Sequence, residues 1–275
     1  MKRLLITGVS TGFGRALAEA ALADGHQVIG TLRDETARAQ FDNLAPGRSF
    51  GKLLDVTNTA AIAPTVKDIE DQIGAIDVLV NNAGYGHEGT VEESTMDELR
   101  RQFEVNVFGA VAMMQAVLPY MRARHLGRII NITSMGGFIT LPGLGFYHGS
   151  KFALEGISES LGKEVKDLGI FVTTVEPGSF RTDWAGRSMF RAARRIHDYD
   201  AVFEPGRNNR KNYSGHQPGD PAKAARAILT LIDASNPPAH LLLGSDAVRN
   251  VGEKLDALKA QFHEWKELSL STDFK

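Results

Sequence analysis

The sequence predicts an α/β protein built on a doubly wound parallel sheet with helices on both faces. Strand-like and helix-like segments alternate from the N-terminus, which is the pattern of repeated right-handed βαβ units. Residues 76–80 form a continuous apolar run, which is typical of a strand covered on both faces. A chain of 275 residues that is 43% hydrophobic and 23% charged has the length and composition of one such domain.

The first half of the chain supplies the first βαβ units. Short apolar runs that end near Gly or polar residues predict strands, and Ala- and Leu-rich or amphipathic stretches predict helices. The expected strands are 3–7, 26–32, 50–55 and 76–80, and the expected helices are 13–23 and 62–73.

The second half continues the alternation after one long helix. The expected helices are 96–124, 146–168, 221–233 and 247–268, and the expected strands are 128–132, 170–175 and 240–243. Residues 184–219 hold Gly, Pro, Asn and many Arg, with a helical hint only at 189–196. We therefore expect a single domain over 1–275, with a flap at about 184–219 that covers the substrate.

Composition excludes several classes of function. Lys and Arg number 31 against 33 Asp and Glu, so a net charge of −2 gives no footprint for nucleic acid. No cysteine is present, which excludes a disulfide framework and a thiolate metal site, and we expect no metal. The apolar stretch 107–118 is shorter than the ~20 residues of a membrane span. We expect a cytoplasmic protein without a membrane partner.

A glycine-rich turn lies between the first predicted strand and the first predicted helix. Its residues are Gly8, Ser10, Thr11, Gly12, Phe13 and Gly14, within the run Thr7–Gly14. Glycines at such a turn let the backbone approach a pyrophosphate, and the helix start offers unpaired N–H groups to the phosphates. A purely structural turn is the alternative, but the position directly after the first strand favours dinucleotide binding.

The end of the second predicted strand bears on which dinucleotide binds. An acidic residue there would bind the ribose 2′-hydroxyl of NAD, and an arginine would bind the 2′-phosphate of NADP. The strand ends in Leu32, which is followed by Arg33 and Asp34. We expect NADP(H) through Arg33. NAD(H) through Asp34 is the alternative, and Arg33 as a solvated loop charge is another.

A tyrosine and a lysine lie four residues apart in a predicted helix. Tyr147 and Lys151 therefore share one face of that helix. An ammonium so close favours the tyrosinate and lowers the pKa of the phenol, which makes Tyr147 a general acid and base. Ser134 follows the strand 128–132 and would bond the same substrate oxygen.

Together these motifs identify the chain as resembling the short-chain dehydrogenase/reductase family over about residues 3–183. The matching pieces are Thr7–Gly14, Asp55-Val56, Asn81–Gly84, Asn106, Ser134, Tyr147-x-x-x-Lys151 and Pro177-Gly178, in the family's order. The resemblance implies a Rossmann-like seven-stranded sheet of order 3-2-1-4-5-6-7. It also implies a homodimer or homotetramer that forms through the helices around 97–121 and the Tyr147 helix.

The resemblance also implies roles for individual residues. Tyr147 would be the acid and base, Ser134 would polarise the substrate oxygen, Lys151 would bind the nicotinamide ribose, and Asn106 would hold a relay water. The implied cofactor contacts are Asp55, Val56, Asn82, Ala83, Gly84, Tyr147, Lys151, Pro177, Gly178 and Thr182. The reaction implied is hydride transfer between NADP(H) and a ketone, aldehyde or secondary alcohol. A redox-sensing regulator that binds NADP(H) without turnover is the alternative.

The substrate pocket is expected near Ser134 and Tyr147 and beneath the flap. Its expected lining is Phe138, Leu141, Leu144, Phe180, Trp184 and Phe190, which suits a fairly apolar substrate. Residues 181–211 hold eight Arg or Lys and four Asp or Glu, so they could attract an anionic substrate, although a solvated lid is the plainer interpretation. His87 and Glu88 are expected at the surface, and His148 is expected to face away from the site.

Overall fold

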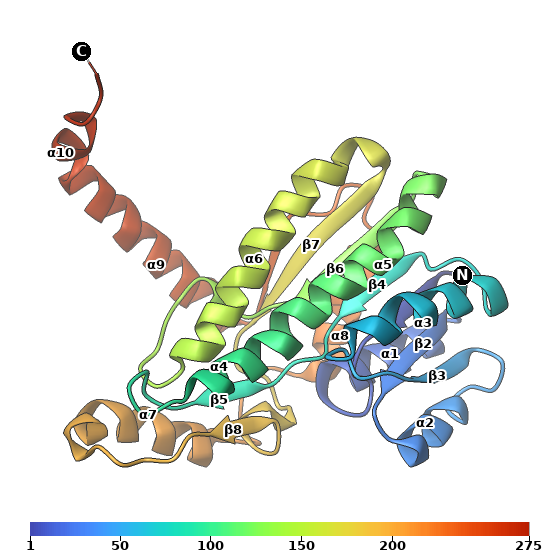
Figure 1. The fold of residues 1–275 in the computed structure, drawn as a ribbon, viewed down its shortest axis with the longest axis horizontal. Coiled ribbons are helices and arrows are strands. Elements are labelled where there is room, and N and C mark those ends of the chain that lie inside the picture. Colours follow the sequence, from blue (N-terminus) through green and yellow to red (C-terminus); the bar gives the residue numbers. More distant parts are fainter. Residues whose placement is uncertain (275) are drawn as a thin grey trace.

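The computed structural model describes residues 1–274, and its centre is a parallel sheet of seven strands (Figure 1). The spatial order is β3-β2-β1-β4-β6-β7-β9, which is the predicted 3-2-1-4-5-6-7 order when these seven strands alone are numbered along the chain. Their bounds are β1 Arg3–Ile6, β2 Gln27–Leu32, β3 Ser49–Leu53, β4 Val78–Asn81, β6 Gly127–Ile132, β7 Ile170–Pro177 and β9 His240–Leu243. The fold is therefore the Rossmann-like α/β fold that the sequence predicts.

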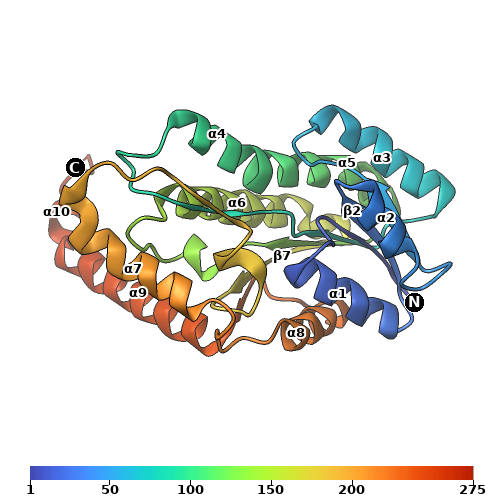
Figure 2. The ribbon, with the colours of Figure 1, turned by 90° about the horizontal axis from the view of Figure 1, so that it is seen from below.

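Helices cover both faces of the sheet (Figure 2). One face packs on α1 (Gly12–Ala23), α2 (Glu35–Asp42) and α8 (Pro221–Asp233), and the other on α3 (Thr59–Gln72), α5 (Gly109–Arg124) and α6 (Gly145–Val165). Leu4 and Ile6 of β1 point to the first face and Leu5 to the second. This alternation follows from the two-residue period of a strand, and it buries all three side chains.

The long helix expected at 96–124 is interrupted by one wide turn. α4 (Met96–Phe103) leads into a π-helical turn at Glu104–Phe108, and α5 follows directly. The whole stretch is long and apolar enough to cross a membrane by length and composition alone. Met113, Val117 and Met121 are nevertheless buried in the core between α5, α3 and the sheet, so the stretch is an interior helix of the fold.

The segment 184–219 is more regular than the sequence indicates. The helical hint at 189–196 is wrong, because β8 (Met189–Arg191) pairs there in parallel with β5 (Gly86–Glu88) as a separate two-stranded sheet. A helix, α7, forms instead at Asp200–Tyr213. Its only buried side chain is that of Phe203, and Pro205 lies inside it, so the helical period in the sequence is weak.

The C-terminal helix leaves the body of the molecule. α9 (Ser245–Glu264) packs against β9 only near its start, where Ala247 and Val251 are buried, and α10 (Lys266–Leu270) follows Trp265. Figure 1 shows both helices projecting from the sheet. Val248, Leu255 and Phe262 are exposed along α9.

Candidate active site

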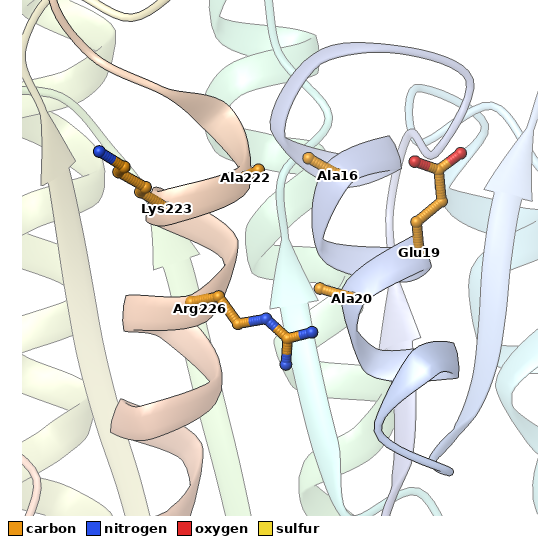
Figure 3. Close-up of a pocket in the computed structure, with 6 residues that line it drawn as sticks. All are labelled: Ala16, Glu19, Ala20, Ala222, Lys223 and Arg226. Carbon is orange, nitrogen blue, oxygen red and sulfur yellow. The ribbon is translucent and has the colours of Figure 1, made fainter.

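A cavity of about 1050 Å³ lies where the parallel strands end. Its walls come from the turns after β1, β2, β3, β4, β6 and β7, from the start of α6 and from the segment 182–217. Ligands in open α/β sheets bind at these carboxyl ends. A smaller hollow of about 460 Å³ lies between α1 and α8 and is lined by Ala16, Glu19, Ala20, Ala222, Lys223 and Arg226 (Figure 3). It holds none of the predicted site residues, so the larger cavity is the candidate site.

The glycine turn forms one wall of the cavity, as expected. Gly8 and Gly12 have φ of +72° and +62°, which side chains adopt rarely. A Cβ at Gly14 would collide with the Gly8 carbonyl oxygen and with the amide of Asn82. Thr11 begins α1 without a side-chain cap, so the N–H groups of the first turn are free to bind an anion.

Asn82 holds this turn to the end of β4. Its Nδ2 donates to the carbonyl oxygens of Thr7 and Gly8, both at 2.9 Å. The hydroxyl of Thr7 accepts from the backbone N–H groups of Asn82 and Ala83 in return. Asn82 therefore shapes the phosphate turn from behind, and Asn82, Ala83 and Gly84 all line the cavity.

Arg33 and Asp34, which follow the second predicted strand, have different surroundings. Arg33 is exposed and lines the cavity. Asp34 is the N-cap of α2, and its carboxylate accepts from the N–H of Ala37 at 2.8 Å. Asp55 and Val56 also line the cavity. The Asp55 carboxylate accepts hydrogen bonds from the N–H and the hydroxyl of Thr57.

Tyr147, Lys151 and Ser134 come together at the centre of the cavity. The Lys151 Nζ is 5.8 Å from the centre of the Tyr147 ring and donates to the Ile132 carbonyl oxygen at 2.9 Å. Burial raises the pKa of Tyr147 to about 12, although hydrogen bonding with Ser134 opposes the rise. Burial also lowers the pKa of Lys151 to about 8. Desolvation therefore outweighs the lowering of the phenol pKa that the spacing of Tyr147 and Lys151 predicts.

Asn106 lies beside this group but behind the cavity wall. It sits in the π-helical turn, and its side chain exchanges hydrogen bonds at 3.1 Å with the backbone N–H and carbonyl of Tyr85. It also donates to the Ser150 hydroxyl at 3.0 Å. Asn106 thus joins α6 to the loop after β4.

Five of the six predicted pocket residues line the cavity. These are Leu141, Leu144, Phe180, Trp184 and Phe190. Phe138 does not, because its ring packs edge-on against His240, with centroids 5.4 Å apart. Trp184 lies over the Tyr147 ring with centroids 5.0 Å apart, and Met189 and Tyr85 complete the apolar wall. Pro177, Gly178 and Thr182 also line the cavity.

His148 faces the site rather than away from it. Its Nδ1 lies 2.8 Å from the Gly136 carbonyl oxygen, and its Nε2 accepts from the N–H of Leu141 at 2.9 Å. Burial lowers the pKa of this imidazole. The neutral ring therefore fixes the loop that carries Ser134 to Leu141, a role for which the sequence holds no separate signal.

His87 and Glu88 are buried, which corrects the surface expectation. The His87 ring stacks between Phe146 and Phe190. Glu88 pairs with Arg210 at 2.7 Å, and Arg191 and Arg207 approach it at 3.3 and 3.5 Å. Because Arg194 in turn pairs with Glu93 and Asp200, most of the flap's arginines are neutralised within the fold.

Comparisons with known proteins agree with this geometry. The sequence model of the short chain dehydrogenase family matches residues 2–190. An oxidoreductase named BOA17 from Botryotinia fuckeliana is 38% identical over 97% of each chain. A 3-ketodihydrosphingosine reductase from Bacteroides thetaiotaomicron is 38% identical over 88% of this chain and 87% of its own.

A crystal structure of a short-chain dehydrogenase from Streptomyces avermitilis shares the whole fold. It is 42% identical, covers 99% of this chain and all of its own, and superposes with a TM-score of 0.92. The protein described here belongs to the short-chain dehydrogenase/reductase family, and it is an oxidoreductase of that family.

Proposed function

We propose that this protein is an NADP(H)-dependent oxidoreductase that interconverts a ketone or aldehyde with its alcohol. The single observation that carries the proposal is the convergence of Ser134, Tyr147 and Lys151 in a cavity that begins at the glycine turn. The relative from Bacteroides thetaiotaomicron is named as a reductase of a keto compound, which supports a carbonyl substrate.

A dinucleotide bound along the cavity would meet residues of each of its walls. The start of α1 would bind the pyrophosphate through its uncapped N–H groups, beside the glycine turn. Asp55 and Val56 would contact the adenine, and Lys151 would contact the nicotinamide ribose. Arg33 supports NADP(H), since Asp34 is already engaged as a helix cap. When bound, the cofactor supplies or accepts the hydride.

The protein's own residues would transfer the proton to and from the substrate oxygen. Tyr147 would donate its phenolic proton to the carbonyl oxygen during reduction and take it back during oxidation. Ser134 would hold the same oxygen, and the Lys151 ammonium would stabilise the tyrosinate that forms. Asn106 would position the loop after β4 and would hold the water of the proton relay. Trp184, Leu141 and Phe190 give the cavity an apolar wall, which would favour an apolar substrate.

Tyr147→Phe tests this proposal. Consumption of NADPH, followed by its absorbance against a panel of ketones and aldehydes, should fall roughly 10²- to 10⁴-fold. The Kd for NADPH should change little, because the phenol serves the proton step. Near-normal turnover in this variant would reject the assignment. Tight NADPH binding by the natural protein without turnover of any substrate would favour the redox-sensing regulator instead.

The remaining expectations stay predictions. Phe108, Phe152 and Ile157 are exposed on α4 to α6, which supports the homodimer or homotetramer proposed through those helices. The flap at 184–219 would cover the substrate within a single domain, and the cytoplasmic location stands as proposed.

A further inference from the structure

A second group of ionisable side chains lies next to Lys151 and has no part in the reaction above. Glu155 is one turn further along α6 on the same side of the helix, Glu176 lies in β7, and His240 begins β9. One polar atom of each lies within 4.8 Å of the others. Glu176 is 0% exposed and Glu155 is 7% exposed. Three separate elements therefore bring two carboxyl groups and an imidazole into the interior.

The hydrogen bonds in this cluster are too few for two carboxylates. The Thr174 hydroxyl donates to Glu176 Oε1 at 2.5 Å, and His240 Nδ1 lies 3.1 Å from the same oxygen. Nδ1 is also 3.3 Å from Glu155 Oε2, but it carries at most one proton. Within residues 1–274, neither oxygen of Glu155 accepts a hydrogen bond, and Glu176 Oε2 accepts none.

The net charge of the cluster indicates whether a proton or a metal ion compensates its two carboxyl groups. Burial raises the pKa of Glu155, although the nearby hydroxyls of Thr133 and Thr174 oppose the rise. Burial and the neighbouring Glu155 raise the pKa of Glu176 to about 7. One proton shared by the pair leaves one negative charge, which the Lys151 ammonium balances. A divalent cation added to two carboxylates and Lys151 would leave a net positive charge in the interior. A shared proton therefore explains the missing hydrogen bonds of the two carboxyl groups better than a metal ion does.

Glu155 and Lys151 act on each other. The Glu155 carboxylate raises the pKa of Lys151 against the lowering effect of burial, and Lys151 lowers the pKa of Glu155. Among residues 1–274, the hydrogen bond that this ammonium donates goes to the Ile132 carbonyl oxygen, so a nearby negative charge would add to its stabilisation. The imidazole of His240, whose side chain is 36% exposed, connects the cluster to solvent.

We propose that Glu155 is a positioning residue that keeps Lys151 protonated, while Glu176 and His240 hold the cluster's proton and exchange it with solvent. The functional consequence rests on the proposed function, in which the ammonium stabilises the Tyr147 oxyanion. Two further acidic groups on elements that carry the cluster or pack on it, Glu159 on α6 and Asp246 on α9, have partners of their own. Glu159 pairs with Lys163, and Asp246 accepts from the Ser179 N–H.

The first experiment measures Lys151 directly and needs no turnover. Trace acetylation of the cofactor-free protein from pH 6 to 10, read by peptide mass spectrometry, gives the titration of each lysine. Loss of a charge so near a buried amine lowers its pKa by on the order of one unit, which raises the neutral fraction at pH 7 about fivefold. Glu155→Gln should show this fivefold faster labelling of Lys151. Lys259, exposed on α9, is the internal reference, and Glu159→Gln is the matched control on the next turn of α6.

The second experiment uses the pH profile of ketone reduction. In Glu155→Gln the alkaline limb of kcat/KM should move about one unit toward lower pH, while the rate at pH 6 changes little. Glu155→Asp keeps the charge and should restore most of the natural profile. If Glu155→Gln proves unstable, Glu155→Asp against Glu176→Gln separates the two carboxyl groups in the same assays.

Three outcomes would overturn the proposal. One is an identical Lys151 titration in the natural protein and Glu155→Gln. Another is stoichiometric Mn²⁺ or Zn²⁺ in native mass spectra of the natural protein that is lost in Glu155→Gln, because the cluster would then be a metal site. The third is an unchanged pH profile in an active Glu155→Gln. If no substrate were turned over at all, the acetylation result would still decide the role of Glu155.

Discussion

The ammonium of Lys151 bonds to the carbonyl oxygen of Ile132 at 2.9 Å, at the end of β6, while the Tyr147 ring centre is 5.8 Å away. Lys151 is thus anchored to the sheet and only borders the phenol. Burial lowers the pKa of Lys151 to about 8 and raises that of Tyr147 to about 12, so burial works against the charged form of both groups.

Lys151→Ala should damage both cofactor binding and the proton step. A charged hydrogen bond contributes about 1.5–3 kcal/mol, so we expect NADPH to bind roughly 10- to 100-fold more weakly. At saturating cofactor, kcat should fall further, because the tyrosinate loses its ammonium. Fluorescence titration and steady-state kinetics measure the two effects. Lys163→Ala, at an exposed position on the same helix, is the control. A lowered kcat with an unchanged Kd would contradict the dual role.

Arg33→Ala should reduce the preference for NADPH over NADH roughly 10- to 100-fold, because the 2′-phosphate would lose one charge-assisted bond. The ratio of kcat/KM for the two cofactors gives the measurement. Asp34→Asn is the matched control, since asparagine also caps a helix and should leave the ratio unchanged. If instead Asp34→Asn shifts the ratio and Arg33→Ala does not, NAD(H) is the cofactor to reconsider.

The sheet and the positions of the motif residues could be predicted because they depend on local patterns. The apolar run 76–80 and the turn Thr7–Gly14 carry their own signals, and the strand order follows from the resemblance to the short-chain dehydrogenase/reductase family. Short or polar elements carry weaker signals. β5 has three residues and is held by a strand 103 positions away, so its pairing with β8 was missed along with α7.

The side-chain environment of the site could not be read from the sequence. The i to i+4 spacing places Tyr147 and Lys151 on one face, but the sequence does not show that Tyr147 is buried or that the Trp184 ring lies 5.0 Å from its own. Phe138 was assigned to the pocket because it is near Ser134 in sequence, yet its ring packs on His240. The burial of Glu88 likewise depends on arginines more than 100 residues away.

His148→Ala should loosen the loop that carries Ser134 to Leu141, because both ring nitrogens are bonded to that loop. We expect a loss of about 1–3 kcal/mol in the free energy of unfolding, since the Leu141 N–H and the Gly136 carbonyl lose their partner. The KM for the ketone should rise, with little change in the Kd for NADPH. Denaturant unfolding and kinetics check both. His263→Ala, on the exposed part of α9, is the control. An unchanged ketone KM would show that the loop does not need this brace.

Glu176→Gln should remove part of the pH dependence of stability. The folded pKa of Glu176 is raised to about 7 by burial and by Glu155, against an ordinary 4.5. A carboxyl with a raised folded pKa stabilises the fold below its unfolded pKa, and this stabilisation is lost as the pH rises through the folded value. Between about pH 4.5 and 7 the natural protein should therefore lose up to roughly 3 kcal/mol from this group. Glu176→Gln should be flatter over that range and should unfold at a higher temperature than the natural protein at pH 8. Thermal unfolding at several pH values measures the difference, with Glu159→Gln as a control that keeps the natural slope. Parallel curves for the natural protein and Glu176→Gln would mean that Glu176 stays ionised in the fold, and the buried negative charge would then need a partner other than a proton.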